Sequence, residues 1–204
     1  QEIVEKYGDE RRTQIVAASG DVSDEDLIAR ENVVVTITST GYAKRTKVDS
    51  YKAQKRGGKG VRGAELKQDD IVKNFFVCST HDWILFFTNF GRVYRLKAYE
   101  LPEAGRTARG QHVANLLEFQ PEEKIAQVIQ IQSYEDAPYL VLATQQGRVK
   151  KSRLTDYESA RSAGLIAINL NEGDALIGAQ LVNEGDDILL TLSLIHISEP
   201  TRPL

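Results

Sequence analysis

From residue 33 onward the chain alternates between short apolar runs and turn residues, a pattern that predicts β-strands. Three segments, residues 33–45, 83–95 and 139–151, share one order of features. Each has an apolar strand, a tight turn ending in glycine, and a second strand with paired basic residues. The turn glycines are Gly41, Gly91 and Gly147, and they lie 50 and 56 residues apart. Because such a turn needs a residue at positive φ, we expect a β-hairpin at each glycine.

The same features follow each hairpin. A tyrosine comes eight to ten residues after the glycine, and a loop containing glycine and arginine comes next; these loops are residues 54–63, 104–110 and 161–164. An apolar strand is then expected around Leu66, around Leu116 and Leu117, and over residues 166–170. Acidic turns at residues 69–70, 122–123 and 172–174 precede the last strands, expected over residues 71–77, 125–131 and 176–182. Units of about 50 residues with four strands each predict an all-β, propeller-type array.

The repeats set the expected boundaries. Residues 1–30 contain a short helix end and an acidic linker. The units span about 31–80, 81–132 and 133–183, and a fourth begins at 184–190 but lacks the turn glycine and the basic strand. Residues 191–204 resemble a translated sequencing adapter, so we expect them to be non-native. The absence of an initial methionine favours a piece of a longer protein.

Composition narrows the class of protein. With 204 residues, 41% hydrophobic and 27% charged, the chain is ordinary for a soluble globular protein. No apolar run approaches the roughly 20 residues that span a membrane, and no signal peptide is present. The single cysteine, Cys78, excludes an internal disulfide and favours a reducing compartment. Its apolar neighbours predict a packed core thiol.

Positive charge is concentrated in one run, residues 42–63, where eight basic residues face a single acid, Asp49, for a net charge of +7. The whole chain carries −3, so the remainder carries −10. A basic, glycine-containing loop indicates a polyanion as partner. The open alternatives are a solvated flexible loop and basic strand ends that only prevent edge-to-edge aggregation.

The repeat places basic side chains at equivalent positions, where they would form one track. Candidate DNA-binding residues on the strands are Lys44, Arg45, Arg92, Arg95, Arg148, Lys150 and Lys151. Those in the loops are Lys55, Arg56, Lys59, Arg62, Arg106 and Arg109. We expect the acidic turns at another edge. Such a track, with no base-reading helix, suits duplex DNA held by its phosphates, with little sequence preference and strong salt dependence.

Enzyme chemistry is not indicated. The glycine-rich loop lacks the Ser or Thr that a P-loop carries after its lysine. The paired acids fall in turns, where solvated caps are expected, and the histidines are isolated. No spacing typical of metal ligands is present, so no cofactor is expected in this chain.

The basic loop resembles the signature box of the A subunits of bacterial DNA gyrases. The matching residues are Gln54, Lys55, Arg56, Gly57, Gly58, Lys59 and Gly60. The units are similar to blades of the C-terminal DNA-wrapping domain of that family, a β-pinwheel whose neighbouring blades exchange strands. Residues 7–13 resemble the end of the preceding breakage-reunion region.

The resemblance implies that this domain wraps duplex DNA, with the box residues completing the wrap, and so supports ATP-dependent negative supercoiling by the whole enzyme. ATP and Mg²⁺ would act elsewhere in the parent enzyme. The gyrase B subunit, as well as another A subunit, would bind through the missing N-terminal region. No tyrosine here lies in the catalytic motif, so the chain alone is not expected to cleave DNA.

The resemblance also implies a bacterial, cytoplasmic, nucleoid-associated protein. A full domain of the family has six blades, whereas three blades and the start of a fourth are expected here as an incomplete ring. Three alternatives remain: the corresponding domain of topoisomerase IV, against which the intact box argues; a propeller acting as a protein-interaction scaffold; and an RNA-binding loop of the Arg-Gly-Gly type on an unrelated fold.

Overall fold

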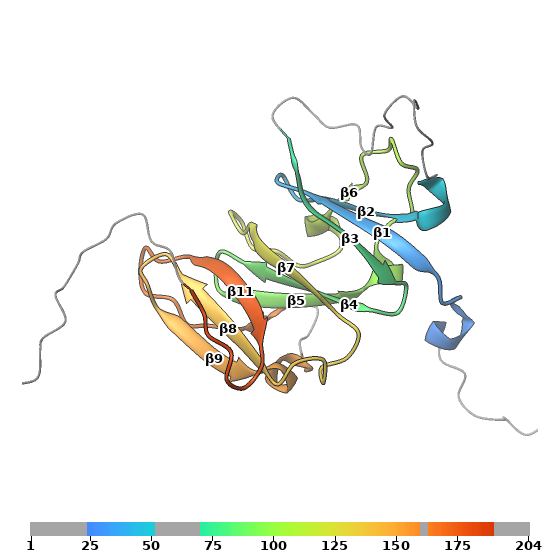
Figure 1. The fold of residues 1–204 in the computed structure, drawn as a ribbon. Coiled ribbons are helices and arrows are strands. Elements are labelled where there is room, and N and C mark those ends of the chain that lie inside the picture. The colour runs from blue at the N-terminus through green and yellow to red at the C-terminus, as the bar shows by residue number, and fades with distance from the viewer. Residues whose placement is uncertain (1–23, 52–69, 160–162, 190–204) are drawn as a thin grey trace, which may run out of the picture.

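The computed structural model describes residues 24–51, 70–159 and 163–189. In this part of the chain the fold is all-β, built from three antiparallel sheets that follow one another in space (Figure 1). The helical segments within these ranges are single 3₁₀ turns: η1 (Asp24–Leu27), η2 (Val48–Ser50), η3 (Ala98–Glu100), η4 (Val113–Asn115) and η5 (Leu154–Tyr157). The expected N-terminal helix end, the strand near Leu66 and the C-terminal tail lie outside the described residues.

The first sheet has the strand order β3-β1-β2-β6. Its strands are β1 (Asn32–Thr38), β2 (Tyr42–Lys47), β3 (Val72–Ser79) and β6 (Gln111–His112). The second sheet has the order β10-β5-β4-β7. Its strands are β4 (Trp83–Thr88), β5 (Arg92–Lys97), β7 (Ile125–Ile131) and β10 (Leu165–Ile166). The third has the order β11-β8-β9, formed by β8 (Tyr139–Thr144), β9 (Val149–Arg153) and β11 (Leu176–Val182).

Neighbouring units exchange a strand. The strand β6 belongs to the second unit by sequence but pairs with β2 of the first, placing Tyr42 opposite His112. In the same way β10 of the third unit pairs with β5 of the second, placing Leu165 opposite Val93. The sheets are therefore linked by backbone hydrogen bonds as well as by side-chain packing, as the pinwheel resemblance implied.

The position predicted for the exchanged strand was wrong in the second unit. The strand covers only Gln111–His112, and the chain then turns through η4. Leu117 is 4% exposed and packs into the core instead of extending a strand. In the third unit the strand ends at Ile166, and the apolar residues after it, Ala167 and Ile168, are core side chains.

The middle sheet packs against a core on each of its two faces. Successive residues of a strand point to opposite faces, so neighbouring residues of β4 enter different cores. Ile84 and Phe86 of β4 belong to the core shared with the first sheet. Leu85 and Phe87 belong to the core shared with the third sheet. This explains why β4 is a continuous apolar run rather than an alternating one.

The hairpin turns form as the repeat predicted. Gly41, Gly91 and Gly147 have φ values of 88°, 71° and 83°, the left-handed region that glycine adopts without strain. Each glycine N–H donates to the carbonyl of the threonine three residues earlier, at 3.0 Å in all three units. The repeat thus reproduces the same turn geometry three times.

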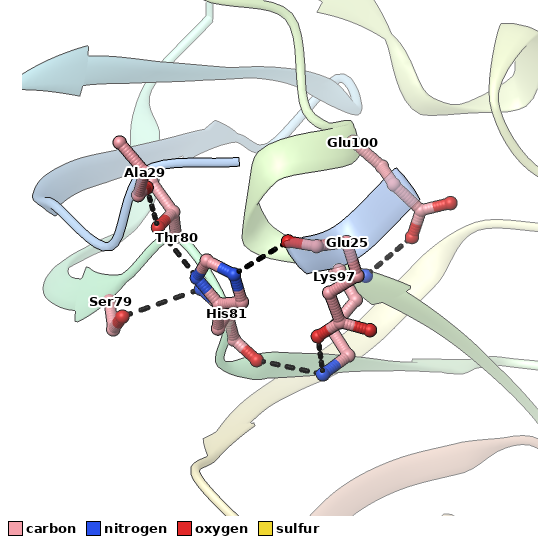
Figure 2. Close-up of polar contacts among 7 residues, drawn as sticks. All are labelled: Glu25, Ala29, Ser79, Thr80, His81, Lys97 and Glu100. Carbon is pink, nitrogen blue, oxygen red and sulfur yellow. Dashed lines mark hydrogen bonds and ion pairs between the residues drawn. The ribbon is translucent and has the colours of Figure 1, made fainter. Parts of the chain in front are cut away.

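The segment before β1 is attached to the junction of the first two units (Figure 2). Thr80 Oγ1, in the β3–β4 turn, donates to the Ala29 carbonyl at 2.9 Å, and the His81 ring contacts the Glu25 carbonyl through Nε2 at 3.3 Å. Lys97 Nζ on β5 forms an ion pair with Glu25 at 2.8 Å. Residues 25–29, in the described part of this segment, are therefore attached to the folded unit.

Candidate nucleic-acid interface

The basic residues of the second hairpin strands occupy equivalent places in β2, β5 and β9, each of which pairs with the first strand of its own hairpin. Counted from the turn glycine, the first position holds Tyr42, Arg92 and Arg148. The third position holds Lys44, Tyr94 and Lys150, and the fourth holds Arg45, Arg95 and Lys151. The three strands therefore present related but unequal sets of cations.

Lys44 is not a surface cation. Its side chain is 1% exposed, and Nζ donates to the carbonyl oxygens of Gly105, Arg106 and Ala108 at 3.2, 2.5 and 2.7 Å. Burial lowers the pKa of this ammonium from its usual value. The structure thus separates Lys44 from the other candidates, because its three N–H donors point into the protein.

Arg45 is half-buried beside the loop of the next unit. Its Nε donates to the Leu101 carbonyl at 2.8 Å, and NH1 lies 3.2 Å from a carboxylate oxygen of Glu103. Part of its charge is therefore compensated within the protein.

The two arginines of β5 are held by neutral groups. The guanidinium of Arg92 donates to the carbonyls of Ala163 and Gly164, just before the exchanged strand β10. Arg95 lies over the Trp83 ring, 4.4 Å from its centroid, and donates to the Tyr134 hydroxyl at 3.4 Å. Both side chains are half-buried and keep N–H donors that these contacts do not use.

The arginines of the loop at residues 104–110 are also oriented without acids. Arg109 stacks on Tyr42, with its guanidinium carbon 3.5 Å from the ring centroid. Arg106 NH1 reaches the Ser50 carbonyl at 3.5 Å. Both arginines belong to the second unit but contact the first, so this loop lies across the boundary between two units.

Arg148, just before β9, and Lys150 and Lys151 on β9 are exposed, whereas Lys44, Arg45, Arg92 and Arg95 are buried or half-buried. Arg148 donates to the Asn171 side chain at 2.9 Å, and Lys150 Nζ donates to the Ala167 carbonyl at 2.7 Å. Lys151 Nζ lies 3.9 Å from the centroid of the Tyr139 ring.

Most of the surface candidates form no close ion pair, although Arg148 and Asp174 interact electrostatically at longer range. Within the described ranges, ion pairs at 4.0 Å or less join Arg45 to Glu103, Lys47 to Glu31 and Lys97 to Glu25. None of these involves the other surface candidates in the same ranges, which are Arg92, Arg95, Arg106, Arg109, Arg148, Lys150 and Lys151. Carbonyls and aromatic rings fix their positions while leaving the positive charge available to an anion.

The box residues Gln54, Lys55, Arg56, Gly57, Gly58, Lys59 and Gly60, together with Arg62, lie outside the described residues. The site described above therefore does not include them.

The acidic turns differ from the expectation of solvated caps at another edge. Asp70 and Glu123 are 6% and 8% exposed, and each binds the hairpin turn of its own unit. Asp70 accepts hydrogen bonds from the backbone and hydroxyl of Thr40, and Glu123 accepts from Thr88 and Tyr94 at 2.5 and 2.9 Å. In the third unit Asp174 accepts from the Gln146 N–H at 2.9 Å. The acids do cap turns, but the expectation that they are solvated was wrong for Asp70 and Glu123, which are buried acceptors for the turn donors.

Hydrogen bonding outweighs burial at Asp70. Burial opposes the charged form, but hydrogen bonds from Thr40, Thr38 and Ser39 stabilise it, and the pKa of Asp70 falls to about 2. The carboxylate therefore stays ionised at neutral pH and stabilises the first hairpin turn through its hydrogen bonds to Thr40.

Other candidates for chemistry have structural roles. Cys78 is 4% exposed, and burial together with the charge of Asp82 raises its pKa to about 12, which confirms the predicted core thiol. Tyr157 is 2% exposed and also lies in the core. Among the described residues, no group of three metal-ligating side chains comes together, and no helix is long and apolar enough to cross a membrane.

Sequence reasoning missed the aromatic supports of the cations. Three cation–π contacts join these groups: Arg109 with the Tyr42 ring, Arg95 with the Trp83 ring, and Lys151 with the Tyr139 ring. Trp83 and Tyr139 are both the first residue of their hairpin, paired with Lys97 and Arg153 across the strand. That shared position is the signal that could have identified them.

The comparisons with known proteins agree with the all-β fold of repeated units. The family described as "DNA gyrase C-terminal domain, beta-propeller" matches the chain at residues 32–79, 82–132 and 138–183. The DNA gyrase A subunit of Mycolicibacterium smegmatis is 76% identical over 189 residues, which are 93% of this chain and 22% of that protein. The corresponding protein of Mycobacterium tuberculosis is 74% identical, with 93% and 23% covered, and that of Streptomyces coelicolor 65%, with 92% and 22% covered. The chain thus spans about a fifth of the length of these relatives.

Two solved structures share the fold. The C-terminal domain of a DNA topoisomerase IV superposes with a TM-score of 0.67 at 32% identity, covering 76% of this chain and 47% of that one. A DNA gyrase A C-terminal domain superposes with a TM-score of 0.58 at 30% identity, covering 76% and 49%. The three DNA gyrase A sequences above, at 65–76% identity, are more similar to this chain than either solved domain, at 32% and 30%.

Proposed function

The chain belongs to the family of DNA gyrase C-terminal domains, and on that basis we propose that it binds duplex DNA through the phosphate backbone and bends it. The observation that carries the proposal is the set of surface cations on β5, on β9 with the turn before it, and in the loop at residues 104–110 that form no ion pair at 4.0 Å or less within the described ranges. Cations held by neutral groups keep their charge for phosphate oxygens.

The binding would ignore base sequence. The described residues contain 3₁₀ turns but no α-helix that could enter a major groove. Arginine and lysine side chains on successive sheets can instead follow the phosphates, which carry no sequence information. Bending would follow where the duplex contacts more than one of the sheets, which succeed one another in space.

Within a complete enzyme, this domain would wrap DNA for ATP-dependent negative supercoiling, working with the gyrase B subunit as well as another A subunit. The box residues Gln54, Lys55, Arg56, Gly57, Gly58, Lys59 and Gly60, with Arg62, would complete the wrap. The chain would contribute binding and geometry, while strand cleavage and ATP hydrolysis would occur in other parts of the enzyme.

Binding to two duplexes of equal length and unrelated sequence tests this proposal. We expect affinities that agree within about twofold, because phosphate contacts dominate. A clear preference for one sequence, or no binding to either, would contradict it; no binding would favour the protein-scaffold alternative.

The variant R148Q/K151Q removes two exposed cations, one from β9 and one from the turn before it. K73Q, on the outer strand β3 of the first sheet, is a single-charge control; because Lys73 Nζ donates to the Ala126 carbonyl of β7 at 2.9 Å, its stability is measured alongside its binding. The double variant should weaken binding to both duplexes equally, with a salt dependence shallower by about one unit per lost contact. K73Q should retain the wild-type salt dependence, and an equal effect of both variants would mean that the basic strands are not the interface.

A further inference from the structure

We infer that Lys44 is a positioning residue that holds the arginine loop of the second unit, residues 104–110, against the first sheet. The inference rests on the proposed function, because it assigns Lys44 an indirect part in binding DNA through Arg106 and Arg109. Lys44 itself does not touch the DNA.

The contacts of Lys44 are those of a buried anchor. Its ammonium has three N–H donors, and the three carbonyls of Gly105, Arg106 and Ala108 match them one to one. Burying a charged group is costly unless it is fully hydrogen-bonded, so this arrangement is stable only when the loop wraps the ammonium. The loop conformation and the position of Lys44 therefore depend on each other.

The two ends of the loop are attached to β2 by other contacts. The Ala104 N–H donates to the Arg45 carbonyl at 3.0 Å, and the Ala104 carbonyl accepts from Thr46 Oγ1 at 2.9 Å. Gly110 packs directly against the backbone of Ala43, where a Cβ would lie 2.4 Å from the carbonyl oxygen. Lys44 holds the middle of the loop, between these two attachments.

The arrangement also has an electrostatic consequence. Carbonyl oxygens carry partial negative charge and would repel a phosphate if they faced it. Three of them turn inward to Lys44, in the stretch that carries Arg106 and Arg109. The buried cation thereby favours a loop whose outward groups attract an anion.

The equivalent positions in the other units lack this arrangement. Tyr94 occupies the position in β5 and donates its hydroxyl hydrogen bond to Glu123. Lys150 occupies it in β9, is exposed, and contacts one carbonyl, that of Ala167. Lys150 is therefore a matched control for Lys44.

The first test uses trypsin without DNA, comparing K44M with K150M in the folded protein. K44M should raise cleavage after Arg106 and Arg109 by about tenfold relative to cleavage after Lys124, because the loop opens locally. K150M should leave these two cleavages unchanged. Unchanged cleavage in K44M would overturn the inference. If K44M does not fold, K44Q, which keeps an amide donor, replaces it with the same expected direction.

The second test is a double-mutant cycle on DNA affinity. K44M should weaken binding of the wild-type chain, but should have little further effect in the R106Q/R109Q background, since Lys44 acts through these arginines. A full additional loss in that background would overturn the inference. Failure of the wild-type chain to bind DNA would contradict the proposed function alone, because the trypsin test would still decide the role of Lys44.

Discussion

Arg109 stacks on Tyr42 with its guanidinium carbon 3.5 Å from the ring centroid, which joins a loop of the second unit to the strand β2 of the first. Tyr42 also meets the His112 ring edge-on, at a centroid distance of 5.3 Å. The tyrosine therefore supports both the arginine loop and the exchanged strand β6 that follows it.

Replacing Tyr42 with leucine should lower the free energy of unfolding by about 0.5–1 kcal/mol, the usual strength of one partly exposed cation–π contact. Urea denaturation measures the change. Tyr42→Phe keeps the ring and should differ from the wild type by only a few tenths of a kcal/mol. If the phenylalanine variant loses as much as the leucine variant, the hydroxyl rather than the ring is responsible.

Asp70 should make the protein acid-sensitive. Its pKa in the folded state, about 2, lies below the ordinary value of 3.8. The carboxylate therefore contributes its full stabilisation above pH 3.8, and this is lost as the pH falls from 3.8 through about 2. We expect the wild type to lose more stability over this interval than Asp70→Asn, measured by urea denaturation across the pH series.

At neutral pH, Asp70→Asn should cost about 1–3 kcal/mol, since it weakens buried hydrogen bonds to the Thr40 turn. Asp187→Asn, at an exposed site, is the control and should behave as the wild type does. A wild-type stability that stays constant down to pH 2 would refute the role assigned to Asp70.

Gly110 should tolerate alanine much less well than Gly147, although both have positive φ, 85° and 83°. A Cβ at Gly110 would lie 2.4 Å from the Ala43 carbonyl oxygen, whereas a Cβ at Gly147 meets nothing within 4 Å. Gly147→Ala should cost about 1–2 kcal/mol from the backbone conformation alone, and Gly110→Ala about 3 kcal/mol or more. Thermal or urea unfolding distinguishes them, and equal costs would mean that the close approach to β2 is not rigid.

The hairpins could be predicted because one local signal determines them. An apolar run, a glycine and a basic run are all within about 13 residues, and the positive φ of Gly41, Gly91 and Gly147 follows from turn geometry. The long last strands β7 and β11 were also predicted with their observed limits, because they are apolar segments bounded by acidic turns.

The exchanged strands could not be placed as well. At two residues each, β6 and β10 are too short for a periodic pattern, so the sequence predicts the strand of the second unit at the nearby apolar residues Leu116 and Leu117 instead. Those leucines belong to the turn after β6 and pack into the core. Two residues cannot show an alternation.

The roles of individual charges depended on long-range contacts. Lys44 was predicted as a contact to DNA, yet it is buried by carbonyls more than 60 residues away in the sequence. Asp70 and Glu123 were predicted as solvated caps, yet they bind turns at least 30 residues earlier. The sequence shows that a charge is present, but only the fold shows which group it meets.

The salt dependence of duplex binding tests the central claim most directly. Each phosphate contact should contribute about −0.9 to the slope of log K against log salt concentration, so six or more contacts would lower the affinity about a thousandfold or more between 50 and 200 mM salt. The phosphate account predicts such a steep, linear decrease for the wild-type chain. An affinity that does not change with salt would contradict it.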